Sequence, residues 1–143
     1  MKKLTFFENG ICILKLEGLP VHDELENLIE EYVMNVELLP QPLKLIFVDI
    51  SELVHMGIRS RQVFSELLIQ ASRHYGGKIE LVISGGSLNL RRYIQLFCKS
   101  IGFKDRSHVF GKLDEANQWV DEWLNGKNSS FKNEAYYLRE QTI

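Results

Sequence analysis

Two short apolar runs open the chain and frame a turn. They span about residues 3–8 and 11–17 and are separated by Asn9-Gly10. Asn-Gly favours a tight turn because both residues tolerate positive φ. The pattern therefore predicts an antiparallel β-hairpin.

Helical spacing replaces this alternation from Asp23 onward. Apolar residues recur on one stripe as far as Val33, and acidic residues occupy the other positions. This spacing predicts an amphipathic helix, with Asp23 as its N-cap and Glu26 completing something close to a capping box. Pro40 and Pro42 prevent the helix from continuing.

The remainder of the chain repeats a strand followed by a helix. Apolar runs at 43–50, 78–84 and 107–111 predict strands, and helical spacing follows each of them: one helix ends at Gly76-Gly77, one starts after Gly85-Gly86-Ser87, and one starts near 113–114. The order β-β-α-β-α-β-α-β-α predicts an α/β fold, with an N-terminal hairpin, a mixed sheet of about five strands and about four helices. Ligands of open α/β sheets bind where the parallel strands end, so the helix starts at that edge are the first place to look for a site.

The chain of 143 residues, 45% of them hydrophobic, is sized for one domain with a substantial core. We expect that domain to span 1–125. The polar residues 126–143 then form a linker and a C-terminal tail, which could include a short helix. Tyr136 and Tyr137 of this tail could dock on the body or on a second copy, and the hairpin edge offers another route to a homodimer.

Charge and cysteine content narrow the function classes. Lys and Arg number 17 against 19 Asp and Glu, a formal charge of −2, so the basic footprint of a nucleic-acid-binding protein is absent. The first residues lack the apolar run of a secretory signal, and no stretch approaches the ~20 apolar residues of a membrane span. Cys12 and Cys98 are interpreted as buried free thiols, with a disulfide or reactive pair as the alternative. These features favour a reducing cytoplasm.

The junction "VDISELVHMGIRSRQ", residues 48–62, is the first candidate site. Ser60 near a helix start fits a capping or solvated first-turn residue. It equally fits a phosphate acceptor or ligand, because helix N-termini favour dianions and Arg59 and Arg61 could add charge-assisted bonds. Asp49 ends the predicted strand and could orient the turn that contains Ser51.

A second helix start repeats this chemistry. In "ISGGSLNLRRY", Gly85 and Gly86 permit close backbone approach, Ser87 can cap the helix, and Arg91 and Arg92 follow about one turn later. The spacing is neither a P-loop nor a dinucleotide-binding fingerprint. Together with Ser60 these residues could form an anion pocket, and the alternative is two ordinary strand-to-helix turns with solvated arginines.

Neither a catalytic nor a metal-binding motif is evident. None of the four histidines, His22, His55, His74 and His108, has the neighbours of a triad, and no cluster has zinc-like spacing. We therefore expect no metal, no cofactor and no catalytic activity. The aromatic residues Trp119 and Trp123 fall at helical i, i+4 spacing, which favours packing over base stacking.

Residues 3–125 resemble the STAS domain of bacterial anti-sigma factor antagonists and sulfate-transporter tails. More closely they are similar to small stand-alone STAS-like proteins with a CRAL-TRIO-type relationship. Three segments carry the resemblance besides the element order: "LEGLPVHDEL", "LIFVDISELVHMGIRSRQ" and "HVFGKLDEANQWVDEWL".

The resemblance implies a non-enzymatic regulatory or protein-interaction module. In the antagonists, Asp-Leu-Ser is followed by Asp-Ser-Ser-Gly, whose serine is phosphorylated by a partner kinase. Asp49-Ile50-Ser51 matches the first motif, whereas "GIRS" at 57–60 replaces the second, so Ser60 can match the phospho-acceptor only with a shift of one position. The implied partner is a kinase, a phosphatase or another regulator. The alternative function is a sensor or carrier of a nucleotide, anion or lipid at the carboxyl edge.

Overall fold

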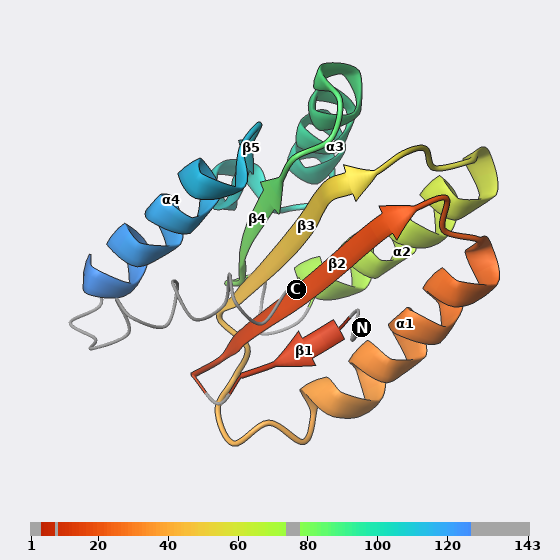
Figure 1. Ribbon diagram of the computed structural model, residues 1–143. Helices are drawn as coiled ribbons and strands as arrows, with labels where there is room; N and C mark the ends of the chain where they lie inside the picture. Colours follow the sequence, from red (N-terminus) through yellow and green to blue (C-terminus); the bar gives the residue numbers. More distant parts are fainter. Residues whose placement is uncertain (1–3, 8, 74–77, 127–143) are drawn as a thin grey trace.

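The computed structural model describes residues 4–7, 9–73 and 78–126. Within these residues the fold is α/β, with one five-stranded mixed sheet and four α-helices, as predicted (Figure 1). The elements in chain order are β1 (Leu4–Phe6), β2 (Ile11–Gly18), α1 (His22–Val36), β3 (Leu45–Leu53), α2 (Ile58–Arg73), β4 (Glu80–Ser84), α3 (Leu88–Ser100), the 3-10 turn η2 (Lys104–Arg106), β5 (Ser107–Phe110) and α4 (Leu113–Gly126).

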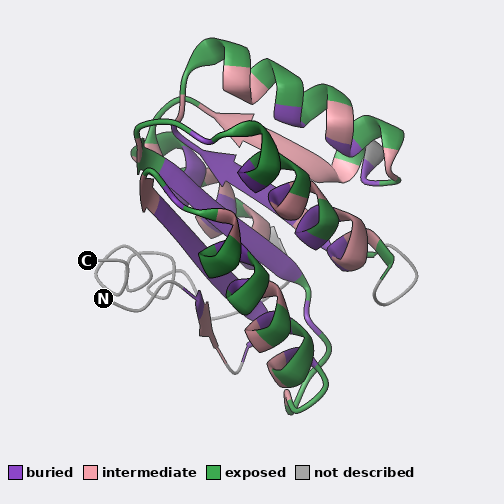
Figure 2. Ribbon diagram, turned by 90° about the vertical axis from the view of Figure 1, so that its right-hand side faces the viewer, coloured by how far each residue is buried: buried purple, intermediate pink, exposed green. Residues whose placement is uncertain are grey.

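The strands lie in the order β1-β2-β3-β4-β5. β1 pairs antiparallel with β2, which confirms the hairpin. β2 to β5 are parallel neighbours, so each of the three crossovers moves one strand along the sheet. Right-handed crossovers in one direction place α1, α2 and α3 on the same face. Figure 2 shows these three helices lying across the sheet with exposed outer surfaces and buried inner ones.

Two apolar cores follow from this arrangement. The larger core joins α1, α2 and α3 to one face of the sheet and includes Tyr32, Leu68 and Cys98. The smaller core joins α4 to alternate residues of the sheet on the other face, including Phe47 and Val82. Alternation of side chains along each central strand explains why β3 is buried on both faces.

Three predictions of detail need correction or lie outside the described residues. Asp23 is not the N-cap: α1 begins at His22, the capping position is Val21, and no side chain caps it. The Leu25 N–H closes the first turn by donating to the Val21 carbonyl (3.3 Å). Asp23 therefore lies within the first turn, where its negative charge interacts favourably with the helix dipole. The predicted helix end at Gly76-Gly77 and the tail 127–143 lie outside the described residues.

Candidate functional site

The carboxyl ends of the four parallel strands form one edge of the molecule, and all four helices begin there. β2 ends at Gly18, β3 at Leu53, β4 at Ser84 and β5 at Phe110. The loops are tied together by backbone hydrogen bonds, including Val54 N–H to Gly18 O (2.9 Å) and Gly85 N–H to Phe110 O (2.9 Å). Candidate residues from distant parts of the sequence are thereby held at one edge.

Asp49 lies inside β3 and not at its end. β3 continues to Leu53, and Asp49 is only 2% exposed. One carboxylate oxygen, Oδ1, accepts from the Ser51 N–H (2.9 Å) and from the Ser51 hydroxyl (2.6 Å). Ser51 itself is exposed. Asp49 therefore orients Ser51 at the start of the junction, although it lies four residues before the end of β3 and not at that end.

Cross-strand register places Asp49 between Lys15 of β2 and Ser84 of β4. All three residues are buried, and Lys15 pairs with Glu52 (3.3 Å). The Ser84 hydroxyl makes no hydrogen bond with any described atom. This polar row crosses the sheet close to the carboxyl edge.

Ser60 is neither a cap nor a solvated residue. It is the third residue of α2 and is 5% exposed. Its hydroxyl donates to the Pro20 carbonyl (2.9 Å), which links the start of α2 to the loop before α1. A kinase could reach this hydroxyl only after the first turn of α2 opened. The geometry therefore favours a structural role for Ser60 in this conformation.

The two flanking arginines differ in their surroundings. Arg59 is exposed at the start of α2. Arg61 is held in place because its Nε donates to the Met56 carbonyl (2.9 Å). Since Ser60 turns inward between them, the structure does not show them grouped around its hydroxyl.

The second helix start forms the predicted turn. Ser87 is the N-cap of α3, and its hydroxyl accepts from the Leu90 N–H (3.2 Å). Gly85 has φ +93°, and a Cβ atom there would overlap the backbone of Ser51 in the neighbouring strand. Gly86 also has positive φ and lies against the Ile50 side chain. The glycines thus serve close packing between β3 and the turn.

The pocket at this edge is lined by a different arginine from the two on α3 that the sequence suggested. Arg91 lies against Gly111 in the loop after β5, and β5 is two strands away from β3, which leads into Ser60 and α2. Arg92 is exposed on α3. A pocket of about 140 Å³ does exist at this edge, but Arg61 is the arginine that lines it together with Ser87. The remaining lining residues are Leu53, Val54, His55, Met56 and Leu90.

His55 is the histidine that the sequence places at this edge, where we expected it to lie in a loop or to pack locally; it lies in the loop and also lines the pocket. It lies in the loop between β3 and α2, where its backbone N–H donates to Gly18 O (3.4 Å). Its position between a parallel strand and the next helix was the available signal, because such loops line ligand sites in α/β sheets.

Exposed apolar side chains lie along the same edge, and one of them, Val54, also lines the pocket. Five of them, all between 52% and 76% exposed, lie on the loops or first helical turns; we call this set the apolar rim, and it consists of Leu19, Val21, Val54, Ile58 and Leu88. Exposed apolar side chains gathered at one edge of a sheet are a candidate interaction surface.

Potential metal ligands are dispersed within the described ranges, and both cysteines are buried. These residues include no group of three or more His, Cys, Asp or Glu that could hold a metal ion. Cys12 and Cys98 are free and buried, which confirms the interpretation as free thiols. Burial raises the pKa of Cys98 to about 12 and, with a smaller contribution from Glu31, raises the pKa of Cys12 well above its usual value.

Among the helices of the described segments, none has both the length and the apolar character needed to cross a bilayer.

Comparison with known proteins adds no relative. No protein-family model matches the sequence, and a search of curated proteins finds no match.

Proposed function

We propose that this protein is a non-enzymatic regulatory module of the STAS type that binds a protein partner through the carboxyl edge of its sheet. The observation that carries the proposal is the apolar rim. The element order and the Asp49-Ile50-Ser51 motif support the STAS relationship. A kinase, a phosphatase or another regulator is the implied partner class.

The rim offers aliphatic surface that a partner could remove from water. Fully burying one large aliphatic side chain is worth about 1.5–3 kcal/mol, so covering two or three of these side chains would contribute at most about 3–9 kcal/mol, from which the cost of association is subtracted. Arg59 is exposed beside Ile58, and arginine at the border of an apolar patch is common in interfaces.

If phosphorylation controls binding, it would have to act at a different serine from the one at the helix start that is phosphorylated in the anti-sigma factor antagonists. The Ser60 hydroxyl is engaged with Pro20, whereas the Ser51 hydroxyl is on an exposed residue. Ser51 donates to Asp49, so a phosphate there would face a carboxylate and disturb the junction through repulsion. We therefore propose Ser51, in preference to Ser60, as the site of a regulatory phosphate.

A second candidate function is supported by the pocket at the same edge. Arg61, Ser87 and His55 line about 140 Å³ at the start of α2 and α3. A helix N-terminus favours negative charge, so a small anionic ligand bound here would make the protein a sensor or carrier.

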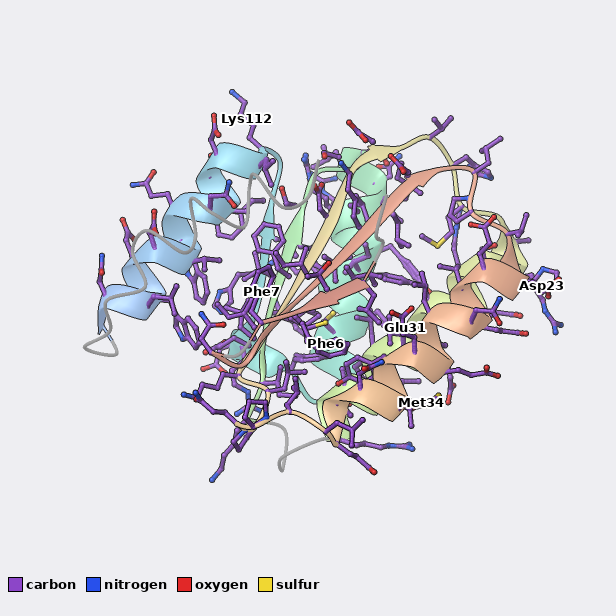
Figure 3. All side chains as sticks on the ribbon, turned by 60° about the horizontal axis from the view of Figure 1, so that its bottom comes forward. Phe6, Phe7, Asp23, Glu31, Met34 and Lys112 are labelled. Carbon is purple, nitrogen blue, oxygen red and sulfur yellow. The ribbon has the colours of Figure 1, made fainter. Side chains whose placement is uncertain are left out.

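Paired charge substitutions on two exposed apolar surfaces test partner binding. One variant combines Val54→Asp and Ile58→Asp on the rim. The matched control combines Met34→Asp and Leu38→Asp, which are 70% and 80% exposed near the end of α1; Figure 3 shows Met34 projecting from the outer side of that helix.

Affinity purification from the native host, followed by mass spectrometry, identifies partners, and calorimetry with the purified partner measures the affinity. We expect the rim variant to bind roughly 10–100-fold more weakly and the control to bind as the unmodified protein does. Equal affinities of the two variants for the partner would show that the rim is not the binding surface.

A further inference from the structure

The outer surface between α2 and α3 carries a groove that continues the pocket at the edge. Its volume is about 500 Å³, within the range of small-molecule sites. Apolar side chains from both helices form much of the lining, with polar residues of α2 beside them: Ile58, Arg61, Gln62, Ile69, Tyr93 and Phe97. A recess of about 10 Å³ beneath it shares residues with both the groove and the edge pocket.

Arg61 lines all three hollows. Its Nε is occupied by the Met56 carbonyl, which fixes the guanidinium where the edge pocket meets the groove. The salt bridges among the described residues do not include Arg61. The arrangement therefore presents a positioned cation, without a carboxylate partner, at one end of a partly apolar groove.

The dimensions of the groove select its occupant. Ile58 to Ile69 spans about 17 Å at 1.5 Å per residue, so a volume of about 500 Å³ corresponds to a mean cross-section of about 30 Å². A helix of 10–12 Å diameter needs roughly 80–110 Å². The groove therefore has room for a single extended chain, whereas a helix could only lie across its opening.

We propose that the α2–α3 groove binds a single-chain amphiphile with an anionic head, the head group at Arg61 and the alkyl chain along Ile69 and Phe97. This inference deepens the second candidate function, because it names the class of ligand. The guanidinium donates charge-assisted hydrogen bonds to the head, and the apolar walls remove methylene groups from water. Glu66, the acidic residue of the groove, lies more than one turn of α2 beyond Arg61, beside the chain and away from the head.

Titration of the ¹⁵N-labelled protein with dodecanoate below its critical micelle concentration tests the proposal. We expect saturable shifts confined to α2, α3 and the junction. Removing the head charge, with dodecanol as ligand or with Arg61→Gln, should weaken binding about tenfold. Arg92→Gln is the matched control, because Arg92 is exposed on α3 and lines none of the three hollows.

Chain length and groove blocking provide independent measurements. Decanoate should bind roughly fourfold more weakly than dodecanoate, since each half-buried methylene contributes about a factor of two. Ser65→Trp fills the groove without altering Arg61 and should abolish the shifts.

Several outcomes would overturn the proposal: no saturable shift, shifts on another face, or equal weakening by Arg61→Gln and Arg92→Gln. Binding only to anionic phospholipid vesicles would assign the surface to a membrane. Binding of inorganic phosphate but not of dodecanoate would overturn this inference and leave the second candidate function standing.

Discussion

Replacing Ser60 by aspartate, the usual imitation of a phosphoserine, is expected to destabilise the fold. The hydroxyl is 5% exposed and donates to the Pro20 carbonyl at 2.9 Å. Ser60→Ala leaves that buried carbonyl without its donor, which costs about 1–3 kcal/mol. An ionised aspartate can only accept hydrogen bonds, so its oxygens would face the Pro20 oxygen in a desolvated position.

Helix-dipole stabilisation of about 0.3–1 kcal/mol near the start of α2 offsets only part of this cost. We therefore expect Ser60→Asp to lower the free energy of unfolding by about 3–4 kcal/mol. This is a large share of the ~5–15 kcal/mol that stabilises a typical domain.

Urea denaturation followed by tryptophan fluorescence measures the effect. With m-values of about 1–3 kcal/mol per molar urea, the midpoint of Ser60→Asp should fall by roughly 1–4 M. Ser87→Asp is the matched control, since Ser87 is an exposed N-cap and aspartate caps as well as serine does; its midpoint should remain almost unchanged. If Ser60→Asp proves as stable as the unmodified protein, the burial argument fails and Ser60 returns as an accessible phosphate acceptor.

Three further predictions concern glycine strain, a buried hydroxyl and the thiols. Gly85→Ala should lower the urea midpoint far more than Gly102→Ala, because both have positive φ but a Cβ at Gly85 would overlap the β3 backbone whereas one at Gly102 meets nothing within 4 Å; equal midpoints would contradict the packing. Ser84→Ala should be neutral or stabilise by up to about 1 kcal/mol, since it removes a buried hydroxyl that no described atom pairs, and a loss of stability on urea denaturation would reveal a partner. Burial raises the pKa of Cys98 to about 12 and that of Cys12 further, so mass spectrometry should find neither alkylated at pH 8 without denaturant. Because unfolded thiols ionise near pH 8.5 and the folded ones stay protonated, the free energy of unfolding should decrease as pH rises above about 8.5.

Local sequence determined the elements of this fold. The period of the apolar residues reports which face is buried, so it located the strands and helices to within a few residues. Ser87 was identified as a cap because the hydrogen bond to Leu90 N–H joins neighbours in the chain. The strand-helix alternation also predicted the parallel sheet and its shared carboxyl edge.

Long-range packing decided which polar groups meet at that edge. Ser60 donates to a residue 40 positions away, and a serine at a helix start carries no sign of such a partner. Arg61 and Arg91 both follow a strand-to-helix turn, yet Arg61 lines the pocket and Arg91 lies against Gly111. Neighbouring helices and loops set these directions, and helical spacing alone does not encode them.

The sequence by itself therefore determined the architecture and the edge at which a site should lie, because both depend on local periodicity and chain order. The tertiary structure alone decided that Ser60 faces inward, that Arg61 joins an edge pocket to a groove, and that Leu19, Val54 and Ile58 share an exposed rim. These features arise where loops from three crossovers converge, and their physical cause is the packing of segments that are distant in the chain.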